Sequence, residues 1–463
     1  MLITTIGAFM SPFDGSVVTV AIPSIASSIR LGLEAAVWVP LAYLLLLTVL
    51  LINVGRLADL HGRKRFYILG FAIFTIGSVL CGVSTTDLQL ISFRALQGTG
   101  AAFIAANSTA IVTDVFPTEG RGRALGINTM AVYFGLTVGP LLGGILVQDF
   151  GWRSIFFVNV PIGILVITLS SLKLRQNTPN VSGAKFDLAG ATTLSVALAT
   201  SLIVLTFGAT YGWFSAPTLL LAAVGVAMLL LFLHIEKGSK FPTLDLALFT
   251  RNRLFAAANA TAFLSYIAVI GVTLTIAIYL ETIKGLSPET TGLYLIAQAV
   301  PMALFSPMSG WLSDHFGSRA LSTVGMGCVS LGLFLLSELN AESPGLDVIL
   351  RLVIVGIGFG LFSSPNTSAV MGSVRQEKLG VAAGTLGTMR FMGQSIGLAM
   401  LGAVMATTLT PQALLTVFTS LTSQGGVVTS EFVTGMRTFF LIATGMGALG
   451  TLASTTRGHE TTH

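Results

Sequence analysis

Long apolar segments recur along the whole chain and are separated by short polar loops. Most of the segments reach about 18 residues or more, which is the length that a transmembrane helix needs. The pattern therefore predicts an all-α membrane protein with fourteen transmembrane helices. These helices are expected at about 3–26, 37–57, 66–84, 88–114, 124–147, 154–172, 187–207, 217–234, 255–280, 290–312, 320–338, 347–371, 380–407 and 433–454.

A short polar motif lies between the second and third predicted helices and occurs again after the tenth. The first copy, residues 55–65, reads GRLADLHGRKR, and the second, residues 310–319, reads GWLSDHFGSR. Three residues recur 255 positions later: Gly55, Asp59 and Gly62 correspond to Gly310, Asp314 and Gly317. A loop that occurs twice between apolar segments indicates two structurally related halves.

The repeat extends beyond this loop. Residues 107–110 (NSTA) match residues 366–369 (NTSA), and three glycines of the fifth helix match three of the thirteenth. The matched glycines are Gly126, Gly135 and Gly139 with Gly384, Gly393 and Gly397. We therefore expect a six-helix bundle at 1–173, a linker with two inserted helices at 174–253, and a second six-helix bundle at 254–463.

The composition agrees with a membrane protein and indicates its orientation. Charged residues make up 9% of the chain, against about 25% in an average soluble domain. Seventeen lysines and arginines lie in loops assigned to one side, whereas three lie on the other, which predicts that both termini are cytoplasmic. The same distribution argues against nucleic acid as a partner. Cys81 and Cys328 lie in apolar segments and predict neither a disulfide nor a metal site.

Two charged residues lie inside predicted helices of the first half. Asp14 is near the middle of the first helix, and Arg94 is in the fourth. A charge inside a bilayer is costly, so Arg94 is expected to face a cavity or a partner. An acid that gains and loses a proton beside a fixed positive charge provides a means of proton coupling. The alternatives are a structural arginine and, for Asp14, a hydrogen bond between packed helices.

The repeated loop is predicted to act as a gate. Gly55 allows two helices to approach closely, and Asp59 can cap a helix or pair with an arginine. The ordinary excess of basic residues on the cytoplasmic side explains Arg63, Lys64 and Arg65, but it does not explain the paired glycines and aspartates. The gating residues are therefore predicted to be Gly55, Asp59, Gly62, Arg63, Lys64, Asp314 and Arg319.

The fifth helix contains the run GLTVGPLLGG at residues 135–144. Small residues four positions apart make a flat face for close packing, and a proline allows a kink. The run predicts a tight pivot made by Gly135, Gly139, Pro140, Gly143 and Gly144. Plain helix packing would produce the same spacing.

Several of these motifs resemble those of one family. The repeated loop resembles the signature of the major facilitator superfamily, and GPLLGG resembles its antiporter signature. Residues 152–161 (WRSIFFVNVP), Asp14 with residues 20–23, and residues 387–397 resemble blocks of the fourteen-helix drug:proton antiporters. The resemblance implies two six-helix bundles around a central cavity, two extra helices, and exchange of protons for an exported organic compound without a cofactor.

In such a fold, helices one, two, four and five and their repeats line the cavity. The predicted substrate contacts are Tyr43, Asn107, Tyr133, Tyr266, Glu281, Gln298, Asn366, Arg390 and Gln394. Ordinary packing is the alternative for each of them. Glu281 has three interpretations: a second proton site, a contact for a cation, or an interfacial charge near Lys284, and the sequence slightly favours the last.

The sequence thus predicts a proton-coupled exporter of drugs, including lipophilic or cationic antimicrobials, in the cytoplasmic membrane. Its expected partners are a small-molecule substrate, protons and the lipid bilayer, and we expect a monomer. An exporter or flippase of a lipid or metabolite is the alternative, because one central acid among basic residues does not select for cations. A non-transporting membrane sensor is a further alternative. An enzyme is not expected, since the sequence shows no nucleophile–base pair, metal cluster or phosphate loop.

Overall fold

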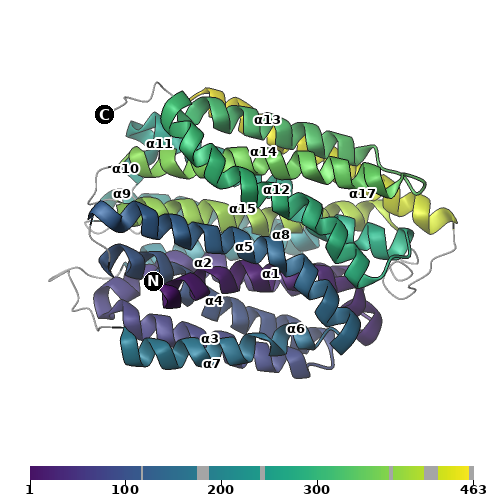
Figure 1. Cartoon of the computed structure of the whole chain (residues 1–463), viewed down its shortest axis with the longest axis horizontal. Helices are drawn as coiled ribbons and strands as arrows, with labels where there is room; N and C mark the ends of the chain where they lie inside the picture. The colour runs from purple at the N-terminus through teal and green to yellow at the C-terminus, as the bar shows by residue number, and fades with distance from the viewer. Residues whose placement is uncertain (116–117, 175–186, 240–245, 375–378, 411–425, 458–463) are drawn as a thin grey trace.

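The structure is a computed structural model of the chain that describes residues 1–115, 118–174, 187–239, 246–374, 379–410 and 426–457 (Figure 1). All secondary structure in these residues is helical, and fourteen helices have 15 residues or more. Eleven helical segments among them are long and apolar enough to cross a membrane. The predicted all-α membrane fold is thus confirmed, because helices satisfy their backbone polar groups internally where no water is present.

The first half of the chain forms one group of packed helices. Helix α1 packs against α5, α4 packs against both α2 and α3, and α3 packs against α7. The bounds are α1 (Leu2–Ile29), α2 (Leu33–His61), α3 (Arg63–Val83), α4 (Asp87–Val115), α5 (Thr118–Phe150), α6 (Ser154–Phe157) and α7 (Asn159–Lys173).

The last part of the chain repeats this arrangement. Helix α11 packs against α15, α14 packs against both α12 and α13, and α13 packs against α17. The bounds are α11 (Arg253–Ile278), η1 (Tyr279–Ile283), α12 (Pro288–Phe316), α13 (Ser318–Ser337), α14 (Gly345–Gly372), α15 (Leu379–Thr408) and α17 (Gly426–Thr455). The pairing of helices therefore agrees with two related halves, while the exact boundaries of the predicted domains stay a prediction.

Close packing at glycines shows the relation between the halves in atomic detail. A methyl group at Gly135 would lie 2.7 Å from the carbonyl oxygen of Phe9, and one at Gly393 would lie 2.5 Å from that of Phe263. Helix α5 thus contacts α1 as α15 contacts α11. The loop glycines Gly62 and Gly317 also correspond, with φ angles of 101° and 80°. These angles are strained for any residue with a side chain.

Two helices lie between the halves in sequence: α8 (Leu188–Tyr211) and α9 (Ala216–Gly238), which pack against each other. Helix α8 also contacts α2 and α15, one from each half. The Asn53 Nδ2 donates to Ser195 Oγ over 3.0 Å and joins α2 to α8. The segment between the eighth and ninth predicted helices (217–234 and 255–280) differs in detail, because α9 continues to Gly238 and the short α10 (Leu246–Arg251) follows.

Two predicted helices are interrupted. The sixth breaks at Val158 into α6 and α7, since Pro161 cannot donate a backbone hydrogen bond and its ring collides with the preceding turn. The ninth ends in the π-helical turn η1, in which the Lys284 amide donates to the Tyr279 carbonyl over 3.1 Å. A π-helical turn of this kind inserts one extra residue and turns the side chains that follow it.

In the described residues, the two halves contact each other mainly where α5 packs on α12, α2 on α15, and α1 on α11 and α12. A methyl group at Gly144 of α5 would lie 2.6 Å from the carbonyl oxygen of Pro288 at the start of α12. A small apolar pocket lies between the halves and is lined by residues of α1, α2, α11, α15 and α17. Its lining includes none of the predicted substrate contacts.

Candidate functional site: a buried ion pair in the first bundle

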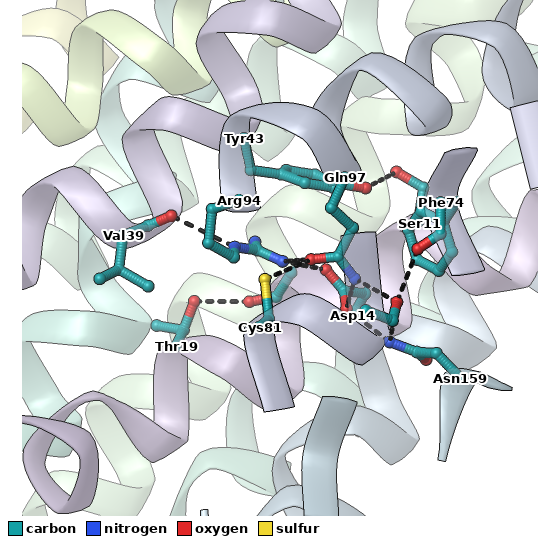
Figure 2. Close-up of polar contacts among 12 residues, drawn as sticks. Ser11, Asp14, Thr19, Val39, Tyr43, Phe74, Cys81, Arg94, Gln97 and Asn159 are labelled. Carbon is teal, nitrogen blue, oxygen red and sulfur yellow. Dashed lines mark hydrogen bonds and ion pairs between the residues drawn. The ribbon is translucent and has the colours of Figure 1, made fainter. Parts of the chain in front are cut away.

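Asp14 and Arg94 form an ion pair inside the first bundle (Figure 2). The distance between Asp14 Oδ2 on α1 and Arg94 Nη1 on α4 is 2.6 Å. Both side chains are shielded by protein, with 1% and 0% of their surface exposed. The two residues that the sequence singled out as charges inside helices thus lie in direct contact.

Two amide side chains complete the coordination of the Asp14 carboxylate. Gln97 Nε2 and Asn159 Nδ2 both donate to Asp14 Oδ1, over 2.9 and 2.8 Å. Gln97 also accepts from Arg94 through its Oε1 at 2.5 Å and donates to Ser78 Oγ at 2.8 Å. These donors satisfy a negatively charged carboxylate, which makes the ionised form tolerable in a region without water.

The Arg94 guanidinium has further partners on α2 and α6. Its Nε donates to the carbonyl oxygen of Val39 over 3.2 Å. Its central carbon lies 4.3 Å from the centre of the Tyr43 ring and 5.9 Å from that of Phe156. An arginine over an aromatic face is attracted by the electrons of the ring, so these rings help to hold the charge. The cluster of Asp14, Tyr43, Ser78, Arg94, Gln97 and Asn159 is called the ion-pair cluster below.

The ion-pair cluster draws on α1, α2, α3, α4 and α7 at once. Breaking a buried ion pair by removing one partner typically costs about 3–5 kcal/mol, because the other charge is left uncompensated. A proton on Asp14 has the same electrostatic effect as removing its charge. Protonation of Asp14 would thus weaken contacts among five helices together.

Two basic residues of the first copy of the repeated loop bond to neighbouring helices near their carbonyl ends. Arg63 Nη1 donates to the carbonyl oxygen of Ala110 on α4 over 3.0 Å, and Lys64 Nζ donates to that of Ser171 on α7 over 2.8 Å. Cations are favourable at the carbonyl end of a helix. These bonds join the cytoplasmic ends of the first bundle on the predicted topology.

The first glycine of the loop lies against the corresponding helix in both copies. Gly55 faces Ala106 of α4, and Gly310 faces Ser364 of α14, which is the corresponding helix. Arg319 is exposed. The side chains of Asp59 and Asp314 lie outside the described residues, so their predicted role as a latch stays a prediction.

The glycine motif of α5 has two packing faces. Methyl groups at Gly139 and Gly143 would lie 2.6 and 3.1 Å from Ser16 and Val17 of α1. On another face, the carbonyl of Pro140 and the backbone at Gly144 contact the beginning of α12. Helix α5 therefore connects the helix that carries Asp14 to the opposite half.

The predicted substrate contacts do not form one group. Tyr43 belongs to the ion-pair cluster, where its hydroxyl lies 2.7 Å from Ser11 Oγ. Asn107 is buried and donates to the Phe103 carbonyl of its own helix over 2.8 Å. Gln298 is buried, and Gln394 is half-buried. The side chain of Tyr133 lies outside the described residues.

Three of the predicted contacts lie in two polar groups of the second half. Arg390 Nη2 donates to Thr367 Oγ1 over 2.6 Å, and its guanidinium carbon lies 5.8 Å from the centre of the Tyr266 ring. Asn366 accepts a hydrogen bond from Arg457 and is buried. Glu281 is 1% exposed, so it is not at an open interface, and Lys284 bonds elsewhere.

Gln97, Asn159 and Ser78 were not assigned a role from the sequence. Gln97 lies three residues after Arg94, which is one helical turn, and Asn159 lies within the WRSIFFVNVP block. A polar residue on the same helical face as an intramembrane charge is the signal that points to such partners. Ser78 carries no such signal, because a serine in an apolar helix also bonds to its own backbone, as it does to Phe74.

Comparison with known families identifies the fold. The model of the Major Facilitator Superfamily matches residues 4–398 and, in a second match, residues 258–457. The chain belongs to the major facilitator superfamily. Members of this superfamily are membrane transporters, and its fold is not that of an enzyme.

Similar proteins and similar solved structures agree with this family assignment. The multidrug resistance protein Stp of Mycobacterium tuberculosis is 36% identical over 410 residues, covering 88% of this chain and 75% of that protein. The riboflavin transporter RibZ of Clostridioides difficile is 35% identical over 413 residues, covering 89% and 88%. The crystal structure of an inward-facing, unoccupied bacterial homologue of the human lysosomal transporter Spinster superposes with a TM-score of 0.70 at 19% identity, covering 98% and 96%.

Proposed function

We propose that this transporter exports organic compounds, including lipophilic drugs, in exchange for protons by alternating access between its two bundles. The observation that carries the proposal is the buried contact of Asp14 with Arg94. Asp14 is the acid that would take up and release the proton, and Arg94 is the fixed charge that its carboxylate balances. The similarity to proteins named for multidrug resistance supports drugs as substrates.

The packing provides a route from the proton to the rest of the molecule. A neutral Asp14 no longer balances Arg94, so α1 and α4 lose their strongest mutual attraction. Helix α1 is packed through close glycine contacts on α5, which in turn contacts α12 of the other bundle. A shift of α1 would therefore be transmitted to the interface between the bundles.

All fourteen long helices are proposed to cross the cytoplasmic membrane, with both termini inside. Helices α2, α4 and α8 lie outside the eleven most apolar segments, yet their 29, 29 and 24 residues pack among those segments. At 1.5 Å per residue, each exceeds the roughly 30 Å of the hydrocarbon core. The excess of basic residues in the loops assigned to the cytoplasm supports the orientation.

The test uses purified protein in liposomes that contain a pH-sensitive dye. A proton gradient is imposed, and tetraphenylphosphonium, neutral drugs and lysolipids are then added in turn. We expect substrate-dependent proton movement in the wild type and none in Asp14→Asn, which keeps the shape of the side chain. Asp87→Asn is the matched control, because Asp87 is exposed at the start of α4. Full coupling in a folded Asp14→Asn variant would exclude the proposed role.

Export of a metabolite is the second candidate function. It is favoured by the similarity to a protein named as a riboflavin transporter, which covers 89% of this chain. The same liposomes, loaded with riboflavin, decide between the two: movement of riboflavin without movement of drugs would support the metabolite.

A further inference from the structure

Glu281 is a buried carboxyl group that the ion-pair cluster does not use. It lies in the π-helical turn η1 at the end of α11, and 1% of its surface is exposed. Among the residues that the structure describes, neither of its carboxylate oxygens has a hydrogen-bond partner. An ionised carboxylate is not stable in such a place, whereas a protonated carboxyl is tolerated. Asp14, in contrast, has one cation and two amide donors.

The charged groups around Glu281 are engaged elsewhere or exposed. Lys284, three residues on, donates through Nζ to the carbonyl oxygens of Ala341 and Ser343 over 2.6 and 2.8 Å. On α14, Arg351 pairs with Asp347 at 2.5 Å. Asp14 on α1 pairs with Arg94, Arg390 on α15 donates to Thr367 Oγ1, and Glu431 on α17 accepts from Thr410. Four further charged side chains on adjoining elements are exposed: Arg30 after α1, Glu289 on α12, Glu342 before α14 and Arg437 on α17. None of these provides a counter-charge for Glu281.

The turn that carries Glu281 packs on α11 and α12 and lies near the contact between the two halves. Leu274, Thr275 and Ile278 of α11 line the apolar pocket between the halves, just before the turn that carries Glu281. The adjoining α12 begins at Pro288, whose carbonyl oxygen lies close to Gly144 of α5, and Gly292 follows against Pro140. Separation of the halves at this end would admit water to the pocket and to the end of α11.

We propose that Glu281 is a second proton-binding residue, which carries a proton while the outer ends of the two halves are packed and releases it when they separate. This proposal rests on the proposed alternating access, but its chemistry is tested separately. The carboxyl would be neutral in the closed arrangement and a hydrated carboxylate in the open one. The π-helical turn places this carboxyl where the ordinary helix would place a different residue.

Labelling with dicyclohexylcarbodiimide tests directly whether the Glu281 carboxyl carries a proton. This reagent adds to protonated carboxyl groups in apolar surroundings and leaves a stable N-acylurea on the residue, which mass spectrometry locates. We expect labelling of Glu281 at neutral pH, its loss in Glu281→Gln, and its retention in Glu289→Gln, an exposed acid at the same end. An unlabelled Glu281 in the folded protein would overturn the proposal.

Release of the proton is tested by forcing the halves apart. Gly292→Leu places a side chain against the Pro140 carbonyl, so α5 and α12 cannot keep their contact. Gly327→Leu is the matched control, because the space beside Gly327 is open. We expect labelling of Glu281 to be lost in Gly292→Leu and retained in Gly327→Leu. Equal labelling in the two variants would overturn the coupling to separation.

The last test measures the number of protons exchanged per substrate molecule in the liposomes described above. In Glu281→Gln we expect one proton fewer to be exchanged per substrate molecule, whereas Glu289→Gln keeps the wild-type ratio. An unchanged ratio in Glu281→Gln would overturn the proposal. If the wild type itself moves no protons with any compound, the proposed antiport fails, and the two labelling experiments still decide whether Glu281 holds a proton.

Discussion

The two bundles are built on the same backbone contacts but have different interiors. Gly98 faces the Tyr43 carbonyl in the first bundle, and Gly356 faces the Gln298 carbonyl in the second. Gly77 packs on Gln97 as Gly332 packs on Val355, and Gly163 packs on Thr75 as Gly447 packs on Ser330. These contacts align the bundles residue by residue. The residues that correspond to Asp14, Ser78, Arg94, Gln97 and Asn159 are then Ala268, Leu333, Leu352, Val355 and Ala443.

All five counterparts are apolar and fully buried. The second bundle therefore keeps the architecture of the first with apolar residues at the five positions of the ion-pair cluster. Buried ion pairs rarely stabilise a fold more than well-packed apolar residues do. A bundle of this architecture therefore exists without the cluster, and this supports a role for Asp14 and Arg94 in transport. The second bundle has a buried acid elsewhere, in Glu281.

The largest effect on stability is expected when residues of the ion-pair cluster are replaced by their apolar counterparts from the second bundle. Arg94→Leu leaves the Asp14 carboxylate buried without its cation and is expected to lower the free energy of unfolding by about 3–5 kcal/mol. Asp14→Ala combined with Arg94→Leu removes both charges and should recover most of that loss. Thermal and denaturant unfolding of the purified protein in detergent measures both variants.

If the double variant is no more stable than Arg94→Leu, the first bundle needs the cluster in order to fold, unlike the second bundle. If the double variant is stable but inactive in the liposome assay, Asp14 and Arg94 act in proton coupling and are not required for folding. The single and double variants together form a cycle that isolates the interaction of the two residues.

A smaller effect on stability is expected from glycine substitutions at positions where the two bundles make the same helix contacts. Gly139→Ala and Gly397→Ala each place a methyl group about 2.5–2.6 Å from α1 or α11, and each should cost about 1–3 kcal/mol of unfolding free energy. Gly384→Ala meets no atom within 4 Å and should be neutral or stabilising by up to about 1 kcal/mol. Unfolding in detergent checks all three. A loss at only one of Gly139 and Gly397 would contradict the equivalence of α5 and α15.

The smallest effect is expected at Arg351 of the second bundle. Arg351 is the seventh residue of α14, as Arg94 is the eighth of α4, but it pairs with Asp347 of its own helix. The Asp347 side chain is 36% exposed, so Arg351→Leu should cost no more than about 1 kcal/mol. Unfolding of Arg351→Leu beside Arg94→Leu measures the contrast. Equal losses would show that the two arginines have the same structural role.

The sequence alone determined the helices, the repeat and the packing faces of α5 and α15. These features are local: a membrane requires apolar helices of a certain length, and glycines four apart mark a close contact wherever it occurs. The repeat of Gly55 and Gly62 as Gly310 and Gly317 predicted related loops, and the structure gives Gly62 and Gly317 the same kind of backbone turn. The break at Val158 was not predicted, because a proline such as Pro161 can kink a helix without ending it. The π-helical turn at Glu281 was not predicted either, since it depends on packing around the helix end.

Which polar residues contact one another could be seen only once the helices were packed together. Asp14 and Arg94 are 80 residues apart, and Asn159 is 145 residues from Asp14. The sequence could mark the charges as costly in a membrane, but these helices are apolar on nearly every face, so it could not fix how each is rotated toward its neighbours. That rotation brings Tyr43 into the ion-pair cluster, and the packing around the end of α11 leaves Glu281 buried without a hydrogen-bond partner among the described residues.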